Sequence, residues 1–127
     1  MKLIILICSL LILLFSAGKS NSQNVQIVFR QGNWQILVDN QPYFIKGVVG
    51  HTYLEKVKEY GGNSVRIGSR KEELDMAQKL GLTALVNLPA SSERYGFDYN
   101  DEAAVQKQLE KAVEIVRKTK DHPAVMM

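Results

Sequence analysis

Short apolar segments alternate with amphipathic segments along most of this chain, and no other feature of the sequence constrains the fold as strongly. Apolar runs near residues 43, 63, 82 and 124 are typical of strands, and apolar residues at helical spacing precede each of the last three. A repeated strand–helix–strand order requires a parallel sheet with right-handed crossovers. The sequence therefore predicts an α/β fold.

Three helices are expected between these strands. The first covers residues 53–60 and stops at two glycines, and the second covers residues 71–80 and stops at Gly81. The third begins after the N-cap residue Asp101, is about 16 residues long and ends at His122-Pro123. Its apolar face is formed by Val105, Leu109, Ala112, Val113 and Val116.

The segment before the first parallel strand has a different pattern. Two short β-prone runs, at residues 25–30 and 34–38, are separated and followed by turn-forming residues. This pattern predicts an antiparallel meander at about residues 24–42. We expect Trp34 to lie in its hairpin core.

Two architectures fit this order of elements. One is a doubly wound sheet, and the other is the start of a (β/α)8 barrel, which usually needs about 250 residues. The 127-residue sequence ends on an apolar run, residues 124–127, that is typical of a buried strand and has no covering helix after it. We therefore expect residues 23–127 to form the first four strands of a (β/α)8 (TIM) barrel, incomplete in this chain, after the short meander.

The first 22 residues have the pattern of a signal peptide. Lys2 precedes an apolar run, residues 3–15, and small and polar residues follow it. A transmembrane anchor is less favoured, because a membrane-spanning helix needs roughly 20 apolar residues. Cleavage is expected after Gly18 or Ser22, which predicts a secreted or periplasmic protein with no membrane attachment after signal removal.

Removal of this segment also changes the composition. Cys8 is the only cysteine, so the mature chain has no thiol for a disulfide or a metal site. Loss of Lys2 and Lys19 lowers the formal net charge from +3 to +1, which gives no support for nucleic acid as a partner. The sequence contains no nucleotide-binding loop and no metal-ligand cluster, so we expect no cofactor and no metal.

Five segments, in order along the chain, resemble the catalytic domain of family 2 glycoside hydrolases and related members of clan A. The longest is WQILVDNQPYFIKGV, which resembles the segment leading into the barrel. GNSVR resembles the second-strand motif of that group. The others are LDMA with GL, ER with GFDYND, and KDHPA, at residues 74–82, 93–101 and 120–124.

This resemblance implies a retaining β-glycosidase that hydrolyses O-glycosidic bonds in a carbohydrate (β-glycoside) substrate. Retaining hydrolysis uses two carboxyl groups about 5–5.5 Å apart. In the family both catalytic glutamates lie on later strands, beyond the end of this sequence, so we assign no catalytic residue. We expect the N-terminal fragment of an exported glycosidase, inactive alone. The alternatives are a non-catalytic carbohydrate-binding or scaffold protein on a half barrel, and a small doubly wound binding protein.

Two candidate substrate-binding residues follow the first two parallel strands. Arg66 lies at the end of the second strand, and the resemblance implies that it holds the nucleophilic carboxylate. A structural ion pair is the alternative role. His51 follows the first strand and could hydrogen-bond a sugar hydroxyl, or it could simply be solvated.

Three further candidates follow the third strand. Asn87 could line the same pocket or cap the strand, and Glu93 and Arg94 lie in a loop where barrel enzymes build substrate contacts. A mutual surface ion pair is the alternative for Glu93 and Arg94. The aromatic residues of this loop could stack on sugar rings or pin the loop to the barrel; they are Tyr95, Phe97 and Tyr99.

Two departures from the family pattern leave the sugar and the linkage open. Ile67-Gly68 stands where relatives usually have Thr and often Trp, and residues 89–92 replace an aromatic and His-containing stretch. An incomplete barrel would also expose strand edges at both ends of its sheet. Self-association through these edges is therefore expected at Phe44, Ile45, Val125 and Met126.

Overall fold

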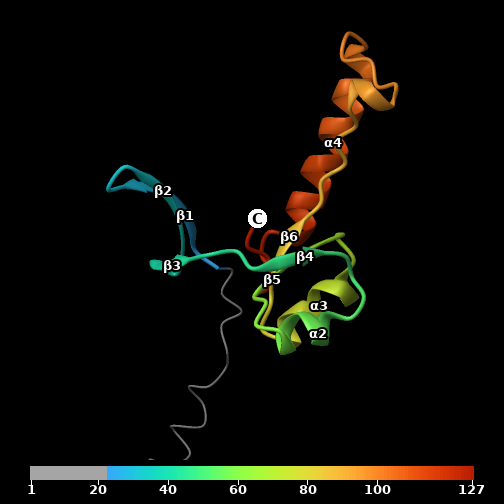
Figure 1. The fold of residues 1–127 in the computed structure, drawn as a ribbon. Coiled ribbons are helices and arrows are strands. Elements are labelled where there is room, and N and C mark those ends of the chain that lie inside the picture. Colours follow the sequence, from blue (N-terminus) through green and yellow to red (C-terminus); the bar gives the residue numbers. More distant parts are fainter. Residues whose placement is uncertain (1–22) are drawn as a thin grey trace, which may run out of the picture.

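The computed structural model describes residues 23–127, which form a mixed α/β fold with two three-stranded sheets (Figure 1). One sheet is antiparallel and the other is parallel. The expected signal peptide, residues 1–22, lies outside the described residues. None of the helices within residues 23–127 is long and apolar enough to cross a membrane.

The antiparallel sheet is a meander of β1 (Val25–Arg30), β2 (Asn33–Val38) and β3 (Gln41–Tyr43). In its register, Ile36 of β2 lies opposite both Ile27 of β1 and Tyr43 of β3. The meander expected near residues 24–42 is therefore present.

The expected burial of Trp34 is wrong, because its side chain is 72% exposed. Trp34 lies opposite Phe29 at the turn end of the hairpin, on a sheet face where Ile27 and Phe29 are also exposed. The buried residue of this hairpin is Leu37. Leu37 lies on the opposite face, because side chains alternate along a strand.

The parallel sheet has the order β4 (Gly47–Val49), β5 (Ser64–Ile67), β6 (Thr83–Val86). Two crossover helices connect these strands, α2 (Leu54–Glu59) and α3 (Lys71–Lys79). This parallel pairing follows from the strand–helix alternation of the sequence. The first parallel strand was expected near residue 43. Tyr43 instead pairs in the antiparallel sheet, and the first parallel strand begins only at Gly47.

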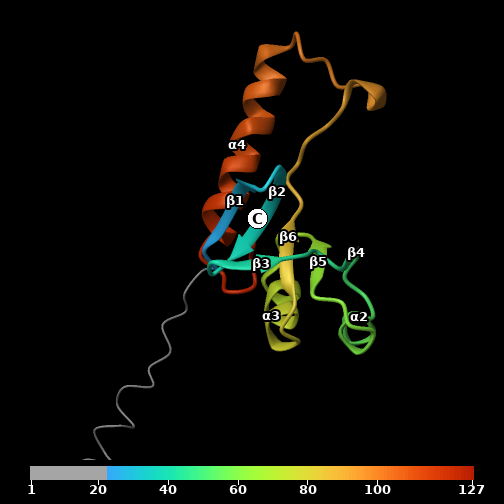
Figure 2. The same cartoon turned by 60° about the vertical axis from the view of Figure 1, so that its left-hand side comes forward.

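The core lies between this sheet and the two helices, which share one of its faces (Figures 1 and 2). Strands β5 and β6 contribute Val65, Ile67 and Ala84, and α3 contributes Leu74 and Ala77. The turn after α2 approaches the helix closely. A Cβ atom at Gly62 would lie 2.5 Å from the Val57 Cγ1 atom and 2.7 Å from the Val57 carbonyl oxygen, so only glycine fits there.

The expectation of four strands of a (β/α)8 barrel is wrong. The structure has two separate three-stranded sheets. Residues 124–127 run beside β6 without forming a strand of their own, joined to it by one isolated parallel bridge, between Ala84 and Val125, and three backbone hydrogen bonds. The chain before that bridge turns tightly, with the His122 amide donating to the Thr119 carbonyl at 2.9 Å. A barrel needs a continuous, tilted ladder in which each strand has two partners. Local periodicity predicted the strands but carries no information about that closure.

The last helix also differs from a barrel helix. It is α4 (Glu102–Thr119), capped by Asp101, whose Oδ1 atom accepts a hydrogen bond from the Ala104 amide at 3.0 Å. With the preceding loop, α4 extends away from the parallel sheet (Figures 1 and 2). Leu109, Val113 and Val116 of its apolar face are exposed rather than packed on strands.

A buried group of hydroxyls joins the meander to the parallel sheet. The Tyr43 hydroxyl lies 3.0 Å from the Ser64 Oγ atom and 2.8 Å from the Thr83 Oγ1 atom, and it donates to the Asn63 carbonyl oxygen at 3.0 Å. The Asn63 side chain forms two hydrogen bonds with the backbone of the segment between β3 and β4. It accepts from the Lys46 amide and donates to the Phe44 carbonyl oxygen. The motif GNSVR therefore supports the junction of the two sheets as well as carrying Arg66.

Candidate functional site

The carboxyl ends of the three parallel strands gather several polar side chains at one edge of the sheet, where open α/β sheets commonly bind ligands. His51 follows β4, Arg66 lies in β5 and Asn87 follows β6. Glu73 joins them from the first turn of α3; its carboxylate lies close to Gly68, just after β5. Three of the five substrate-binding candidates predicted from sequence are therefore at this edge.

Arg66 and Asn87 are in direct contact. The Arg66 Nε atom donates a hydrogen bond to the Asn87 Oδ1 atom at 2.5 Å. This contact connects neighbouring strands, because Arg66 pairs with Leu85 in the ladder and Asn87 follows two residues later. The backbone N–H group of Asn87 donates a hydrogen bond to the Ile67 carbonyl oxygen at 2.9 Å, which holds the backbone of Asn87 against β5.

A cavity of about 250 Å³ lies beside Arg66. Its walls combine Arg66 with apolar and small residues of all three strands, among them Val49, Ser64 and Leu85. An arginine side chain has five N–H donors, and only the Nε donor is used in the contact with Asn87. The arrangement can donate hydrogen bonds to an oxygen-rich ligand that rests on an apolar surface.

Glu73, Arg70 and His51 form a second cluster at the same edge. The Glu73 side chain is only 10% exposed, and its Oε1 atom accepts from the Arg70 Nε atom at 3.0 Å. The His51 Nδ1 atom lies 3.8 Å from the same oxygen. The hydrogen bond and charge of Glu73 raise the pKa of the exposed Arg70 guanidinium. His51 therefore lies near a carboxylate, and its side chain is 57% exposed.

A further charged contact ties α3 to the segment after α4. The His122 Nε2 atom lies 3.1 Å from the Asp75 Oδ1 atom, and the His122 Nδ1 atom accepts from the Ala124 amide at 3.2 Å. Since Nδ1 accepts, Nε2 carries the ring proton and donates it to Asp75. Hydrogen bonds from Lys71 and then from His122 lower the pKa of the Asp75 carboxyl group.

Glu93 and Arg94 lie in a short 3-10 helix, η1 (Glu93–Tyr95), within the loop that extends away from the parallel sheet (Figure 2). The structure does not bring them together with Arg66 and Asn87. The Arg94 guanidinium lies over the Tyr95 ring, 5.9 Å from its centroid. Both Glu93 and Arg94 are exposed.

The other loop aromatics hold the loop to itself. The Phe97 and Tyr99 rings pack edge to face at 4.8 Å, and the Tyr99 hydroxyl donates to the Ser91 carbonyl oxygen at 2.7 Å. These contacts are internal to the loop, so the expected pinning of the loop to a barrel is not what Phe97 and Tyr99 do.

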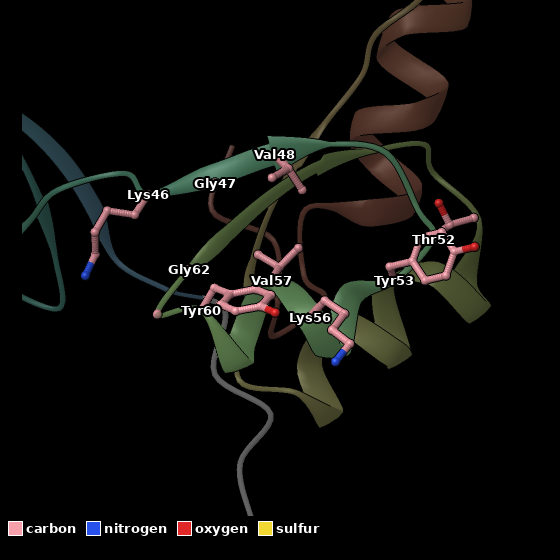
Figure 3. Close-up of a pocket in the computed structure, with 10 residues that line it drawn as sticks. Lys46, Gly47, Val48, Thr52, Tyr53, Lys56, Val57, Tyr60 and Gly62 are labelled. Atoms are coloured by element: carbon pink, nitrogen blue, oxygen red, sulfur yellow. The ribbon is translucent and has the colours of Figure 1, made fainter.

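A groove of about 520 Å³ runs between β4 and α2 (Figure 3). Val48, Val57 and Tyr60 line it, while the charged ends of Lys46 and Lys56 point away from it. Lys56 also forms an ion pair with Glu59 at 2.8 Å. The groove therefore lacks the converging polar groups found at the strand ends.

Sequence reasoning missed Glu73 and Arg70. The available signal was the short link between β5 and α3, which places the first helical turn at the carboxyl edge of the sheet. Within residues 23–127, no group of three or more His, Cys, Asp or Glu side chains is arranged to hold a metal ion.

Comparison with protein-family models and with curated proteins finds no match for this chain. The resemblance to family 2 glycoside hydrolases therefore rests on the five sequence segments alone.

Proposed function

We propose that this chain is part of an exported β-glycosidase, and that its own contribution is to bind the sugar through Arg66 and Asn87. The observation that carries the proposal is the 2.5 Å contact between the Arg66 Nε and Asn87 Oδ1 atoms at the ends of neighbouring parallel strands. The resemblance of GNSVR to the second-strand motif of family 2 glycoside hydrolases supports a position for Arg66 at the active-site mouth, where it implies contact with the nucleophilic carboxylate of the complete enzyme.

The chemistry of the pair suits a carbohydrate. The Oδ1 atom of Asn87 accepts from Arg66, and the side-chain NH2 group of Asn87 adds two donors. The guanidinium adds further donors in a fixed plane. Adjacent hydroxyl oxygens of a sugar accept such bonds, while Val49 and Leu85 offer an apolar surface to its C–H groups.

The acidic residue at this edge does not supply the catalytic pair. Glu73 contacts the basic side chains of Arg70 and His51, so its carboxylate is already engaged within the protein. Retaining hydrolysis needs two carboxyl groups about 5–5.5 Å apart on either side of the scissile bond. We therefore assign binding, and no catalytic step, to the residues at the strand ends.

Calorimetric titration of the full chain with cellotetraose, xylotetraose and mannotetraose tests this role. The chain should bind at least one of them, and Arg66→Ala should weaken that binding by at least about tenfold, because hydrogen bonds to a charged group contribute about 1.5–3 kcal/mol. Arg94→Ala is the matched control, since it removes an exposed arginine far along the loop. Equal affinity of Arg66→Ala and the unmodified chain would contradict the proposal.

A further inference from the structure

Strand β4 is an open edge of the parallel sheet. In the order β4-β5-β6 it has a neighbour on one side only, and all three of its residues are exposed. The Lys46 carbonyl oxygen accepts a hydrogen bond from β5 at 3.3 Å, and the Gly50 amide donates one to β5 at 3.1 Å. Because backbone groups alternate in direction along a strand, residues 46, 48 and 50 face β5. The N–H and C=O groups of Gly47 and Val49 therefore face outward, and they have no hydrogen-bond partner among residues 23–127.

These outward backbone groups specify what can bind at the edge. Unpaired N–H and C=O groups along an edge strand are a template for a further strand. Charged side chains and prolines commonly protect such edges, but β4 has neither, and Val49 is 74% exposed. Three residues offer only four outward backbone groups, so apolar contacts must add to the pairing.

The groove between β4 and α2 supplies apolar contacts beside this edge (Figure 3). Val48 lies on this side of the sheet, as does the residue paired with it, the core residue Val65. Tyr53 and Tyr60, just before and just after α2, also line the groove and are exposed. A strand added to β4 would bury part of these side chains.

A second copy of β4 matches this edge in an antiparallel register, with a two-fold axis at Val48. Gly47 of each copy then lies opposite Val49 of the other, and the two pairs exchange four backbone hydrogen bonds. The two Val48 side chains meet at the axis, in a pair without hydrogen bonds, where side chains approach most closely. The axis is perpendicular to the sheet, so the two grooves come together on one face.

Charge favours the same arrangement. Lys46 precedes β4 at its amino end, and Glu55 lies in the first turn of α2, which follows the carboxyl end of β4. Antiparallel pairing brings the amino end of one β4 beside the carboxyl end of the other. Lys46 of each copy therefore comes to the same end of the interface as Glu55 of the other, whereas parallel pairing would bring the two Lys46 side chains together.

We propose that two copies of this chain pair through β4 and form one six-stranded sheet with the order β6-β5-β4-β4-β5-β6. The interface consists of residues 47–49 and the groove beside them. It lies after Phe44 and Ile45, where the sequence predicts self-association, because the first parallel strand begins only at Gly47. The pairing does not depend on sugar binding at the strand ends.

Cysteine cross-linking tests this register. In the full chain with its only cysteine removed by Cys8→Ser, Val48→Cys places two thiols at the axis, with Cα atoms about 4.5 Å apart and within reach of a disulfide. Val49→Cys is the matched control, because its two Cα atoms would lie roughly 9 Å apart, too far for a disulfide. Copper-catalysed oxidation should convert most of the Val48→Cys chain to a covalent dimer, and about tenfold less of Val49→Cys. No cross-linking of Val48→Cys, or equal cross-linking of both variants, would overturn the pairing.

Size-exclusion chromatography with light scattering, at the concentration used for cross-linking, tests the hydrogen bonds. The unmodified chain should be a dimer and Val49→Pro a monomer, because proline removes an N–H group that faces outward and leaves the ladder with β5 intact. Val49→Ala keeps that N–H group and should remain a dimer, and far-UV circular dichroism should be the same for all three. A monomeric unmodified chain would overturn the proposal. A dimer that persists in Val49→Pro would place the contact on another surface, such as the exposed face of α4, and would overturn it as well.

Discussion

Helices α3 and α4 are both amphipathic, yet the structure uses their apolar faces differently. Leu74 of α3 is 2% exposed and packs with β5 and β6, whereas Leu109 of α4 is 55% exposed. Both helices begin near acidic residues and end near basic ones, as the helix dipole favours. Apolar periodicity therefore identifies the apolar face of a helix but not the surface that covers it.

The largest expected effect contrasts these two leucines. Leu74→Ala should lower the free energy of unfolding by about 2–5 kcal/mol, because it opens a cavity in the core. Leu109→Ala should change it by less than about 0.5 kcal/mol, because the side chain is already exposed. Urea unfolding followed by circular dichroism measures both. Similar losses for the two variants would mean that α4 is packed in solution.

A second prediction concerns the close packing of α2. Gly62→Ala should cost about 1–3 kcal/mol, because the added Cβ atom would meet the Val57 side chain and backbone. Gly68→Ala is the matched control, since its Cβ atom would meet only the end of the Glu73 side chain, at 3.2 Å. Thermal unfolding of both variants decides the point, and a Gly62→Ala protein as stable as Gly68→Ala would refute the close approach.

Removing a hydroxyl group from the junction between the two sheets should lower the free energy of unfolding by a smaller amount. Tyr43→Phe removes the hydroxyl that contacts Ser64, Thr83 and the Asn63 carbonyl, and should cost about 0.5–1.5 kcal/mol. Tyr60→Phe removes an exposed hydroxyl and should cost almost nothing. If the two variants unfold at the same urea concentration, the hydroxyl group does not join the sheets in solution.

The smallest effect is a pH dependence. Hydrogen bonds from Lys71 and His122 lower the pKa of Asp75 below its ordinary value of 3.8 in the folded protein. This contribution to stability is therefore complete above about pH 3.8 and is lost as the pH falls through the folded pKa. Asp75→Asn should show a shallower loss of stability over that acidic range in urea titrations. Asp121→Asn controls for the removal of one exposed carboxylate, and an identical slope for Asp75→Asn and the unmodified chain would contradict the assignment.

The sequence predicted the secondary structure well where turn chemistry and periodicity agree. Gly61-Gly62 and Gly81 mark the ends of the two crossover helices, and Asp101 caps α4 as expected. The sequence did not predict that Tyr43 pairs with the meander, or that residues 124–127 are joined to β6 by one bridge and three backbone hydrogen bonds without forming a strand. Those outcomes depend on hydrogen bonds between distant segments.

The residues of the candidate site also fall into those that the structure places at the strand ends, as expected, and those that it places elsewhere. Asn87 was expected either to line the same pocket as Arg66 or to cap its strand, and the structure brings the two side chains into contact. Glu93 and Arg94 were expected at the same mouth but lie in the loop before α4, which extends away from it. Nothing in the composition of that loop specifies its direction, since its aromatic contacts are internal to it.

Local sequence patterns specify the meander, the parallel order of β4, β5 and β6, and the helices, because turn residues and apolar spacing act within a few positions of the chain. Long-range contacts, by contrast, keep the two sheets separate, leave Trp34 open to solvent and bring Glu73 to Arg70 and His51. The physical reason is that burial and strand closure depend on which distant surfaces come together, and the same amphipathic pattern is compatible with a covered face or an open one.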